Sequence, residues 1–195
     1  MRIVAGKFRG RNLTKSDHLK SLRPTTDKNR EALFNILSSA KFIKEIGFKI
    51  EDAVILDVCC GSGAVAFEAL SRGAKSATLI DNSRTHLELA QKNSEILKVE
   101  NEIEILCLDA KKLPKNDKNF DLIFIDPPYE DSYLEIIKNL LGKNWIKKSS
   151  LVVVEFETRS TGSGQANELK NFENLKLLEF RKYGKTSFAF LQFMN

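Results

Sequence analysis

Short apolar runs alternate with segments of helical periodicity along most of the chain. Runs rich in β-branched and aromatic residues predict strands at 54–60, 77–80, 103–108, 121–125 and 151–156. Apolar residues that recur every three or four positions predict helices at 64–71, 83–98 and 133–141. Strands that are apolar on both faces and separated by helices are typical of a parallel, doubly wound α/β sheet with helices on both sides.

The C-terminal end departs from this alternation. Residues 176–183 and 186–193 are both strand-like, and only Gly184-Lys185 separates them. A connection this short has no room for a helix, so the two segments predict a hairpin. The last strand is therefore expected to run antiparallel to its partner.

The N-terminal end predicts a small basic extension, residues 1–26, attached to a main domain, residues 27–195. Its first part, 2–13, is expected to form a short hairpin with basic side chains exposed, and a helix is expected over 27–40. Residues 1–30 hold nine basic and two acidic residues, a charge of +7, whereas the rest of the chain carries 22 basic and 24 acidic residues. Such a basic segment favours a polyanion as partner, because phosphate contacts release counterions; an ordinary solubilising terminus is the alternative.

The composition excludes several classes of protein. The 195 residues, 42% hydrophobic, fit one domain with a full core, and no apolar run approaches the roughly 18 residues that a membrane span needs. We expect neither a secretory signal nor a membrane partner, and a cytoplasmic location. Three cysteines without C-x-x-C spacing, Cys59, Cys60 and Cys107, favour buried thiols over disulfides or a zinc site.

An acidic residue stands at or near the end of four predicted strands: Asp57, Asp81, Asp109 and Asp126. Ligands bind at the carboxyl ends of the strands in such sheets. The turn Gly61-Ser62-Gly63 after the first strand fits a loose nucleotide-binding pattern that NAD enzymes share. Because a carboxylate at Asp57 would repel a pyrophosphate but suits an amino group and a sulfonium, the sequence favours S-adenosylmethionine over NAD.

The other acids have separate expected roles. Asp81 follows the glycines by about 20 residues, the spacing of an acid that binds ribose hydroxyls, and Asn82 could contact the ribose or the adenine edge. Asp109 could accept a hydrogen bond from the adenine amine, or it could be a plain turn residue.

Asp126-Pro127-Pro128-Tyr129 is the motif with the most chemical content. The two prolines stiffen the turn after the fourth strand and remove two backbone donors. The Asp126 carboxylate and the Pro127 carbonyl could then accept both hydrogens of a nucleobase amine, which localises its lone pair, while Tyr129 stacks on the extruded base. A purely structural turn is the alternative. A cysteine-based mechanism is not expected because Cys59 and Cys60 belong to the first strand, and His18 and His86 lack companions at metal-ligand spacing.

Together these motifs resemble the class I methyltransferases, whose seven-stranded sheet has an antiparallel last strand. Residues 1–11 (MRIVAGKFRGR), 22–27 (LRPTTD), 30–35 (REALFN) and 68–74 (EALSRGA) resemble, more narrowly, the bacterial ribosomal RNA small subunit methyltransferase D family. The resemblance spans nearly the whole chain. One departure is Cys59-Cys60, where that family more often has an aromatic and a small residue.

The resemblance implies N2 methylation of one guanine in 16S rRNA, on a ribosomal particle, by an enzyme that we expect to be a metal-free monomer. It implies catalytic roles for Asp126 and Tyr129, and we expect Pro127 and Pro128 to share in them. It implies cofactor contacts for Asp57, Gly61, Gly63, Asp81 and Asp109, and we expect Ser62, Asn82 and Ala110 to line the same site. It implies that the residues facing RNA or bordering the pocket are Lys7, Arg9, Arg11, Arg23, Thr25 and Arg30.

Three other functions stay open on the sequence alone. The same tetrapeptide would serve an adenine N6 methyltransferase acting on DNA or RNA. A non-catalytic RNA-binding assembly factor could keep the fold, although the intact Asp126 and glycine turn argue against it. An NAD oxidoreductase fits least well.

Overall fold

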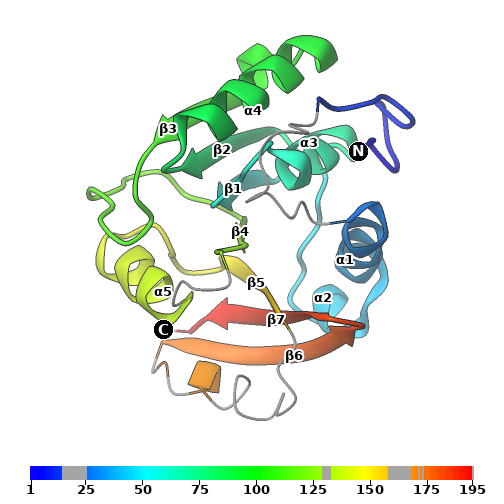
Figure 1. The fold of residues 1–195 in the computed structure, drawn as a ribbon. Coiled ribbons are helices and arrows are strands. Elements are labelled where there is room, and N and C mark those ends of the chain that lie inside the picture. The colour runs from blue at the N-terminus through cyan, green and yellow to red at the C-terminus, as the bar shows by residue number, and fades with distance from the viewer. Residues whose placement is uncertain (15–25, 129–132, 158–167, 171, 173, 195) are drawn as a thin grey trace.

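The computed structural model describes residues 1–14, 26–128, 133–157, 168–170, 172 and 174–194. They form one twisted sheet with helices on both faces (Figure 1). The helices are α1 (Asp27–Ser39), α2 (Lys41–Glu45), α3 (Ala64–Ser71), α4 (Arg84–Leu97), the 3-10 helix η1 (Glu100–Glu102) and α5 (Tyr133–Gly142). The strands are β1 (Val54–Val58), β2 (Ser76–Asp81), β3 (Ile103–Cys107), β4 (Leu122–Ile125), β5 (Leu151–Glu157), β6 (Leu175–Tyr183) and β7 (Thr186–Phe193).

The sheet has seven strands in the order β3-β2-β1-β4-β5-β7-β6. Strands β1 to β5 pair in parallel, whereas β7 is antiparallel to both β5 and β6. This confirms the predicted fold class and the C-terminal hairpin. The chain builds outward from β1 to β3 and then returns to the other side of β1, so the strand order reverses between β1 and β4. Such a reversal opens a crevice at the carboxyl ends of the strands, where doubly wound proteins bind ligands.

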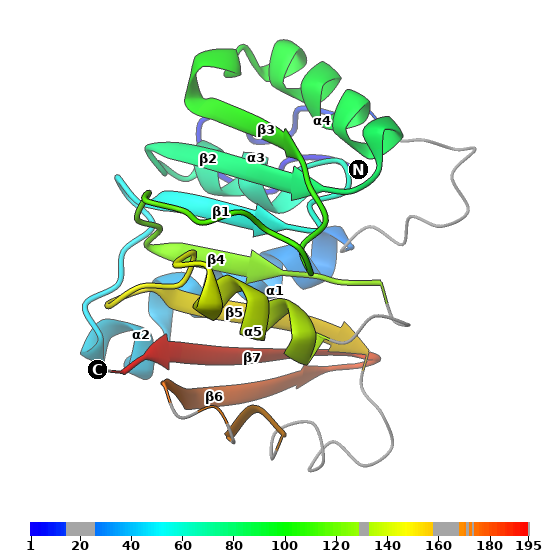
Figure 2. The same ribbon diagram turned by 90° about the vertical axis from the view of Figure 1, so that its left-hand side faces the viewer.

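Two hydrophobic layers hold the helices against the sheet. Alternate residues of each strand face opposite sides, so Val153 of β5 packs in one layer and Val152 in the other. The first layer receives apolar residues from α1, α2, α3 and α4. The second receives those of α5, which lies in front of the sheet in Figure 2. Both faces of the parallel strands are therefore covered, which explains their unbroken apolar runs.

The N-terminal segment packs onto the main body beside α3, as Figures 1 and 2 show. Ile3 and Leu13 belong to the first hydrophobic layer and are 1% and 4% exposed. The segment folds back on itself, with the Ile3 amide donating to the Arg11 carbonyl at 2.9 Å. The predicted hairpin is reduced to a single antiparallel bridge between Arg2 and Asn12. The division of the chain at residue 26 stays a prediction.

Three details differ from the sequence-based expectation. Strand β1 ends at Val58 rather than residue 60, because Cys59 has a φ of 60° and turns the chain out of the sheet. Helix α2 has only five residues, too few for a periodic pattern. The expectation of buried thiols is wrong for Cys107, which is exposed, and overstated for Cys59 and Cys60, which are partly exposed. None of these three cysteines forms a disulfide. Within the described residues, no helix combines the length and apolar character that a membrane crossing requires.

Candidate active site

The strand reversal brings three of the four predicted acidic residues together. Val58 of β1 pairs with Ile80 on one side and Ile125 on the other, so Asp81 and Asp126 end the two strands that flank β1. Asp57 lies one residue before the end of β1. The negative charges of Asp126 and Asp81 both act on the Asp57 carboxyl. The site is therefore a cluster of carboxyl groups at one end of three adjacent strands.

Asp57 is the most deeply buried member of this cluster, with 2% of its surface exposed. Its Oδ2 accepts a hydrogen bond of 3.1 Å from the Ala66 amide in α3. Burial raises the pKa of Asp57 to about 8, and the nearby Asp126 and Asp81 add to the rise, whereas the Ala66 bond opposes it. Without a ligand, burial and the neighbouring acids therefore favour the neutral form of the Asp57 carboxyl.

Asp81 fastens the glycine turn to β2. Its Oδ2 accepts a bond of 2.9 Å from the Gly61 amide, and its Oδ1 accepts one of 2.8 Å from the Ser83 amide. The Nδ1 atom of His86 lies 3.2 Å from the same Oδ1. Asp81 is 7% exposed, so these contacts hold its carboxyl in one orientation.

The glycine turn leaves several backbone amides available to a ligand. Gly63 has a φ of 77°, and a Cβ there would lie 2.6 Å from the Leu79 side chain, so only glycine fits. The turn leads directly into the first turn of α3, whose amides have no partners within the helix. In the described part of the chain, the amides of Ser62, Ala64 and Val65 bond to no acceptor. These donors, at the positive end of a helix, suit a carboxylate.

The Asp-Pro-Pro segment follows β4 without a break. The Asp126 amide bonds to the Val58 carbonyl at 3.2 Å, which continues the parallel ladder and fixes the start of the turn. Asp126 is partly exposed, Pro127 is buried and Pro128 is exposed. The acidic side chain therefore lies where buried structure meets the surface. Tyr129, the predicted stacking residue, lies outside the described residues.

The neighbouring cysteine is unsuited to nucleophilic catalysis. Burial raises the pKa of the Cys60 thiol well above its usual range, and the charges of Asp57 and Asp81 raise it further. A thiol with a raised pKa is protonated at neutral pH, and only the thiolate is a good nucleophile.

The remaining predicted cofactor residues follow the ends of β2 and β3. Asn82 is exposed just beyond β2, and Ala110 is buried. Asp109 lies two residues beyond the end of β3, and its Oδ1 accepts a bond of 2.9 Å from the Lys111 amide. This contact is typical of an acid that stabilises a turn. The described residues contain no group of three His, Cys, Asp or Glu side chains that could hold a metal ion.

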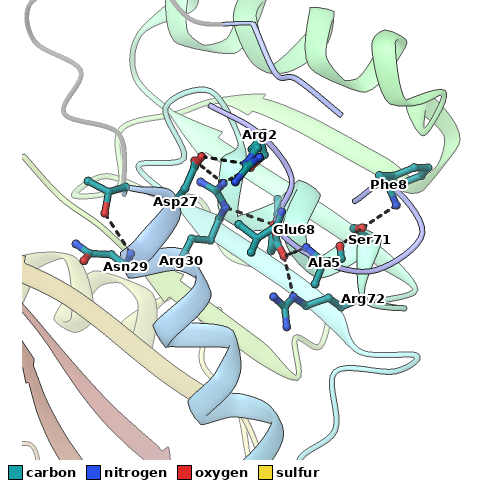
Figure 3. A network of polar contacts seen from close by, with 12 residues as sticks. Arg2, Ala5, Phe8, Asp27, Asn29, Arg30, Glu68, Ser71 and Arg72 are labelled. Carbon is teal, nitrogen blue, oxygen red and sulfur yellow. Dashed lines mark hydrogen bonds and ion pairs between the residues drawn. The ribbon is translucent and has the colours of Figure 1, made fainter. Parts of the chain in front are cut away.

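Helix α3, which begins at the glycine turn, also holds the N-terminal segment (Figure 3). Its Glu68 is fully buried and accepts bonds from the amides of Val4 and Ala5, at 2.8 and 3.0 Å. Glu68 also lies 2.8 Å from Nε of Arg72 and 3.5 Å from Nε of Arg30. One carboxylate therefore ties the segment to two guanidinium groups.

A second set of bonds on the same helix adds to this attachment. Ser71 Oγ donates to the Ala5 carbonyl at 2.5 Å and accepts from the Phe8 amide at 2.9 Å. Gly6 lies so close that a Cβ there would be 1.8 Å from the Ser71 carbonyl oxygen. The N-terminal segment is thus a docked part of the structure rather than a loose tail.

The predicted RNA-contacting residues fall into three groups. Lys7, Arg9 and Arg11 are exposed; Lys7 pairs with Glu102 at 3.2 Å, while Arg11 donates to the Ile96 carbonyl at 3.2 Å. Arg23 and Thr25 lie outside the described residues.

The expected RNA contact of Arg30 is corrected by the structure, because the Arg30 side chain is fully buried and cannot reach RNA. It bonds to Asp27 at 3.0 Å, to the Arg2 carbonyl and to Glu68 (Figure 3). Its role here is to join α1 to α3 and the N-terminal segment.

Sequence reasoning missed three polar residues that shape the site: Glu68, His86 and Asn93. An isolated acid in the apolar segment of α3 was a usable signal for Glu68. His86 follows Asp81 by five residues, and nothing in the sequence marks their contact. Asn93 is fully buried in α4, where its Nδ2 donates to the Ser62 carbonyl at 3.1 Å.

The sheet order, the antiparallel β7, the glycine turn and the acids at the strand ends together define a Rossmann-like class I methyltransferase. Comparison with known proteins agrees. The family described as Conserved hypothetical protein 95 matches residues 1–192. The chain is 35% identical to Ribosomal RNA small subunit methyltransferase D of Haemophilus influenzae, over 98% of this chain and 93% of that protein. It is 38% identical to the Escherichia coli K12 protein of the same name, over 82% of this chain and 76% of that protein.

Among solved structures, the putative methyltransferase yhhF from Escherichia coli superposes with a TM-score of 0.79 and 33% identity. The match covers 99% of this chain and 97% of that one. The chain therefore belongs to the Conserved hypothetical protein 95 family, together with the proteins named Ribosomal RNA small subunit methyltransferase D, and it is a methyltransferase.

Proposed function

We propose that this enzyme transfers a methyl group from S-adenosylmethionine to the exocyclic N2 amine of a guanine in 16S rRNA. The observation that carries the proposal is the position of Asp126. Its carboxyl follows β4 directly, beside the ends of β1 and β2, where the glycine turn and the other acids converge.

The residues around the glycine turn fit the polar end of S-adenosylmethionine. The amides of Ser62, Ala64 and Val65 can bind its carboxylate, since they bond to no acceptor in the described chain. Asp57 suits its amino group, because a nearby ammonium would lower the raised pKa of Asp57 and favour the charged pair. When bound, the cofactor supplies a methyl group already activated by a sulfonium.

The Asp-Pro-Pro segment would act on the nucleobase. A guanine amine is a weak nucleophile because its lone pair is delocalised into the ring. The Asp126 carboxylate and the Pro127 carbonyl can each accept one of its hydrogens, which localises the lone pair and directs it at the methyl group. As the new N–C bond forms, the bond between that methyl carbon and sulfur would break and its electron pair would stay on sulfur, while the amine gives one proton to Asp126. Tyr129 is expected to stack on the extruded base. Alignment is then the main contribution of the protein.

The substrate assignment rests on two further supports. The relatives carry the words "ribosomal RNA small subunit" in their names, and the sequence resembles their family from residue 1 onward. The N-terminal segment is also docked on α3, and the exposed side chain of Arg9 has no partner in the described chain. An exposed cation held on a rigid support suits RNA phosphates, whose binding depends strongly on charge. The assignment to guanine N2 in 16S rRNA rests on the resemblance.

The test is methylation by the purified enzyme with labelled S-adenosylmethionine, using unmodified 16S rRNA and assembled small subunits. The product nucleoside, identified by mass spectrometry, should be N2-methylguanosine. N6-methyladenosine would favour the adenine alternative. Failure to bind S-adenosylmethionine in calorimetry would favour a non-catalytic RNA-binding factor.

A pair of variants ties the activity to the site. Asp126→Asn should lose methylation while the cofactor still binds. Asp117→Asn makes the same chemical change at an exposed acid in the loop before β4, and it should leave the rate unchanged. Equal activity of the two variants would contradict the role of Asp126.

A further inference from the structure

The buried amide of Asn93 connects the glycine turn to the N-terminal segment. Asn93 lies in α4 and is completely inaccessible to solvent. Its Nδ2 donates to the Ser62 carbonyl at 3.1 Å, and its Oδ1 accepts from the Thr14 amide at 2.7 Å. The partners fix which atom is which, because a carbonyl can only accept and an amide N–H can only donate. One side chain therefore spans two segments that are 48 residues apart along the sequence.

Both segments have separate roles in the proposed reaction. Ser62 is the middle residue of the glycine turn, and its own amide is one of the donors available to the cofactor. Thr14 belongs to the same N-terminal segment as Lys7, Arg9 and Arg11. A bond to the Ser62 carbonyl restrains the peptide plane of the turn. A bond to the Thr14 amide restrains the backbone of the basic segment close to Arg11.

We propose that Asn93 is a positioning residue that couples cofactor binding to RNA binding. The inference rests on the proposed function, since it concerns the same cofactor and the same RNA. When the cofactor orders the turn, the Ser62 carbonyl holds the Asn93 amide in place, and that amide then holds Thr14. RNA that binds the basic segment meets a support that is already ordered. By thermodynamic reciprocity, RNA must raise cofactor affinity by the same factor.

Glu68 forms a parallel attachment but does not replace this connection. Glu68 joins the start of the N-terminal segment to the middle of α3, one turn beyond the glycine turn. Asn93 contacts the glycine turn itself. Loss of the Asn93 hydrogen bonds is therefore expected to change the coupling between cofactor and RNA binding. Loss of the Glu68 hydrogen bonds would instead release the whole N-terminal segment from α3.

The test compares Asn93→Leu with Asn116→Leu. Asn116 is a matched control, because it is another buried asparagine that bonds to backbone atoms, of Lys118 and Asn144, on the opposite face of the sheet from α4. Leucine has nearly the same shape as asparagine and removes all of these bonds. Both variants should lose stability to a similar extent, so a difference in ligand binding between them cannot arise from stability alone.

The readouts are dissociation constants measured on the full chain. S-adenosylhomocysteine is titrated in the presence and absence of a saturating 16S rRNA transcript, and the ratio of the two constants is the coupling factor. We expect a wild-type factor of at least about 5, within the usual range for coupled sites. Asn93→Leu should weaken S-adenosylhomocysteine binding about tenfold, a loss equal to one ordinary polar contact, and should reduce the factor to about 1, the value for independent sites. Asn116→Leu should leave both quantities at the wild-type values.

Each outcome has one reading. If the wild-type enzyme binds neither ligand, the proposed function fails. If it binds both, and Asn93→Leu keeps the wild-type coupling factor or Asn116→Leu loses it equally, the role of Asn93 fails while the proposed function stands.

If Asn93→Leu does not fold, hydrogen exchange on the wild-type enzyme decides. Bound S-adenosylhomocysteine should then slow exchange of the Thr14 amide more than that of the Lys118 amide, which bonds to Asn116. Equal slowing of the two amides would overturn the proposal.

Discussion

Replacing Glu68 with alanine should destabilise the enzyme more than any single change on its surface. The Glu68 carboxylate is fully buried and accepts hydrogen bonds from two backbone amides of the N-terminal segment. It also pairs with Arg30, whose side chain is equally buried, and with Arg72. Alanine would leave both amides without their acceptor and would remove the buried carboxylate that pairs with Arg30.

The size of the effect follows from these contacts. Removing one partner of a buried ion pair costs about 3–5 kcal/mol, because the remaining charge is left in a medium of low dielectric constant. Since Asp27 and the Arg2 carbonyl still contact Arg30, we expect a loss of about 4 kcal/mol in the free energy of unfolding, within that range. In a chain of this length, each kcal/mol lowers the melting temperature by roughly 2–4 °C, so the shift should be about 8–16 °C.

Denaturant unfolding of Glu68→Ala and of a control, Glu45→Ala, measures this directly. Glu45 pairs with Lys41 at 3.6 Å on the exposed face of α2, with exposed side-chain fractions of 62% and 91%. An exposed pair of this kind contributes about 0.3–0.5 kcal/mol. A loss below about 1 kcal/mol in Glu68→Ala, close to that of an exposed pair, would refute the reasoning that Glu68 holds the N-terminal segment in place.

Three further predictions concern the protonation of Asp57, the close packing of Gly6 against Ser71 and the contact of Arg9 with RNA. Because the folded-state pKa of Asp57 is raised from 3.8 to about 8, its contribution to stability is greatest at low pH and is lost as pH rises through that range. In urea unfolding, Asp57→Asn should therefore become increasingly more stable than the wild type from pH 5 to 8, and a difference that does not change with pH would contradict the assignment. Gly6→Ala should unfold at a markedly lower temperature in calorimetry than Gly10→Ala, because both glycines have positive φ but only Gly6 faces the Ser71 carbonyl; equal melting temperatures would argue against the docking contact. Arg9→Glu should weaken RNA binding and reduce the slope of log affinity against log salt by about 1 in filter binding, whereas an unchanged slope would exclude a phosphate contact.

The main domain was predictable because its sequence patterns are local. Ala64–Ser71 is helical over the predicted residues, since an apolar segment between two glycines has clear limits. The C-terminal hairpin also follows from a connection too short for a helix. The acidic residues at the strand ends were visible for the same reason, and the register of β1 with β2 and β4 brings Asp81 and Asp126 to the two sides of β1.

The connections between distant segments were not predictable from such patterns. The family resemblance implied that Arg30 faces RNA or borders the pocket, but its side chain is buried because Glu68, 38 residues later, provides a partner that no local pattern reveals. Asn93 shows the same limit, since its two bonds reach Ser62 and Thr14. The protonation of Asp57 likewise depends on burial and on neighbouring acids from other strands.

The most direct test of the account is a crystal structure of the enzyme with bound S-adenosylhomocysteine. In the proposed reaction the base amine lies at hydrogen-bond distance from Asp126, and its nitrogen lies about 3–3.5 Å from the methyl carbon that it attacks. The cofactor sulfur must therefore lie within roughly 8 Å of the Asp126 carboxylate. We expect the sulfur to face Asp126, with the cofactor carboxylate on the amides at the start of α3. A sulfur that faces away from residues 126–128, or lies much farther from them, would contradict the proposed mechanism.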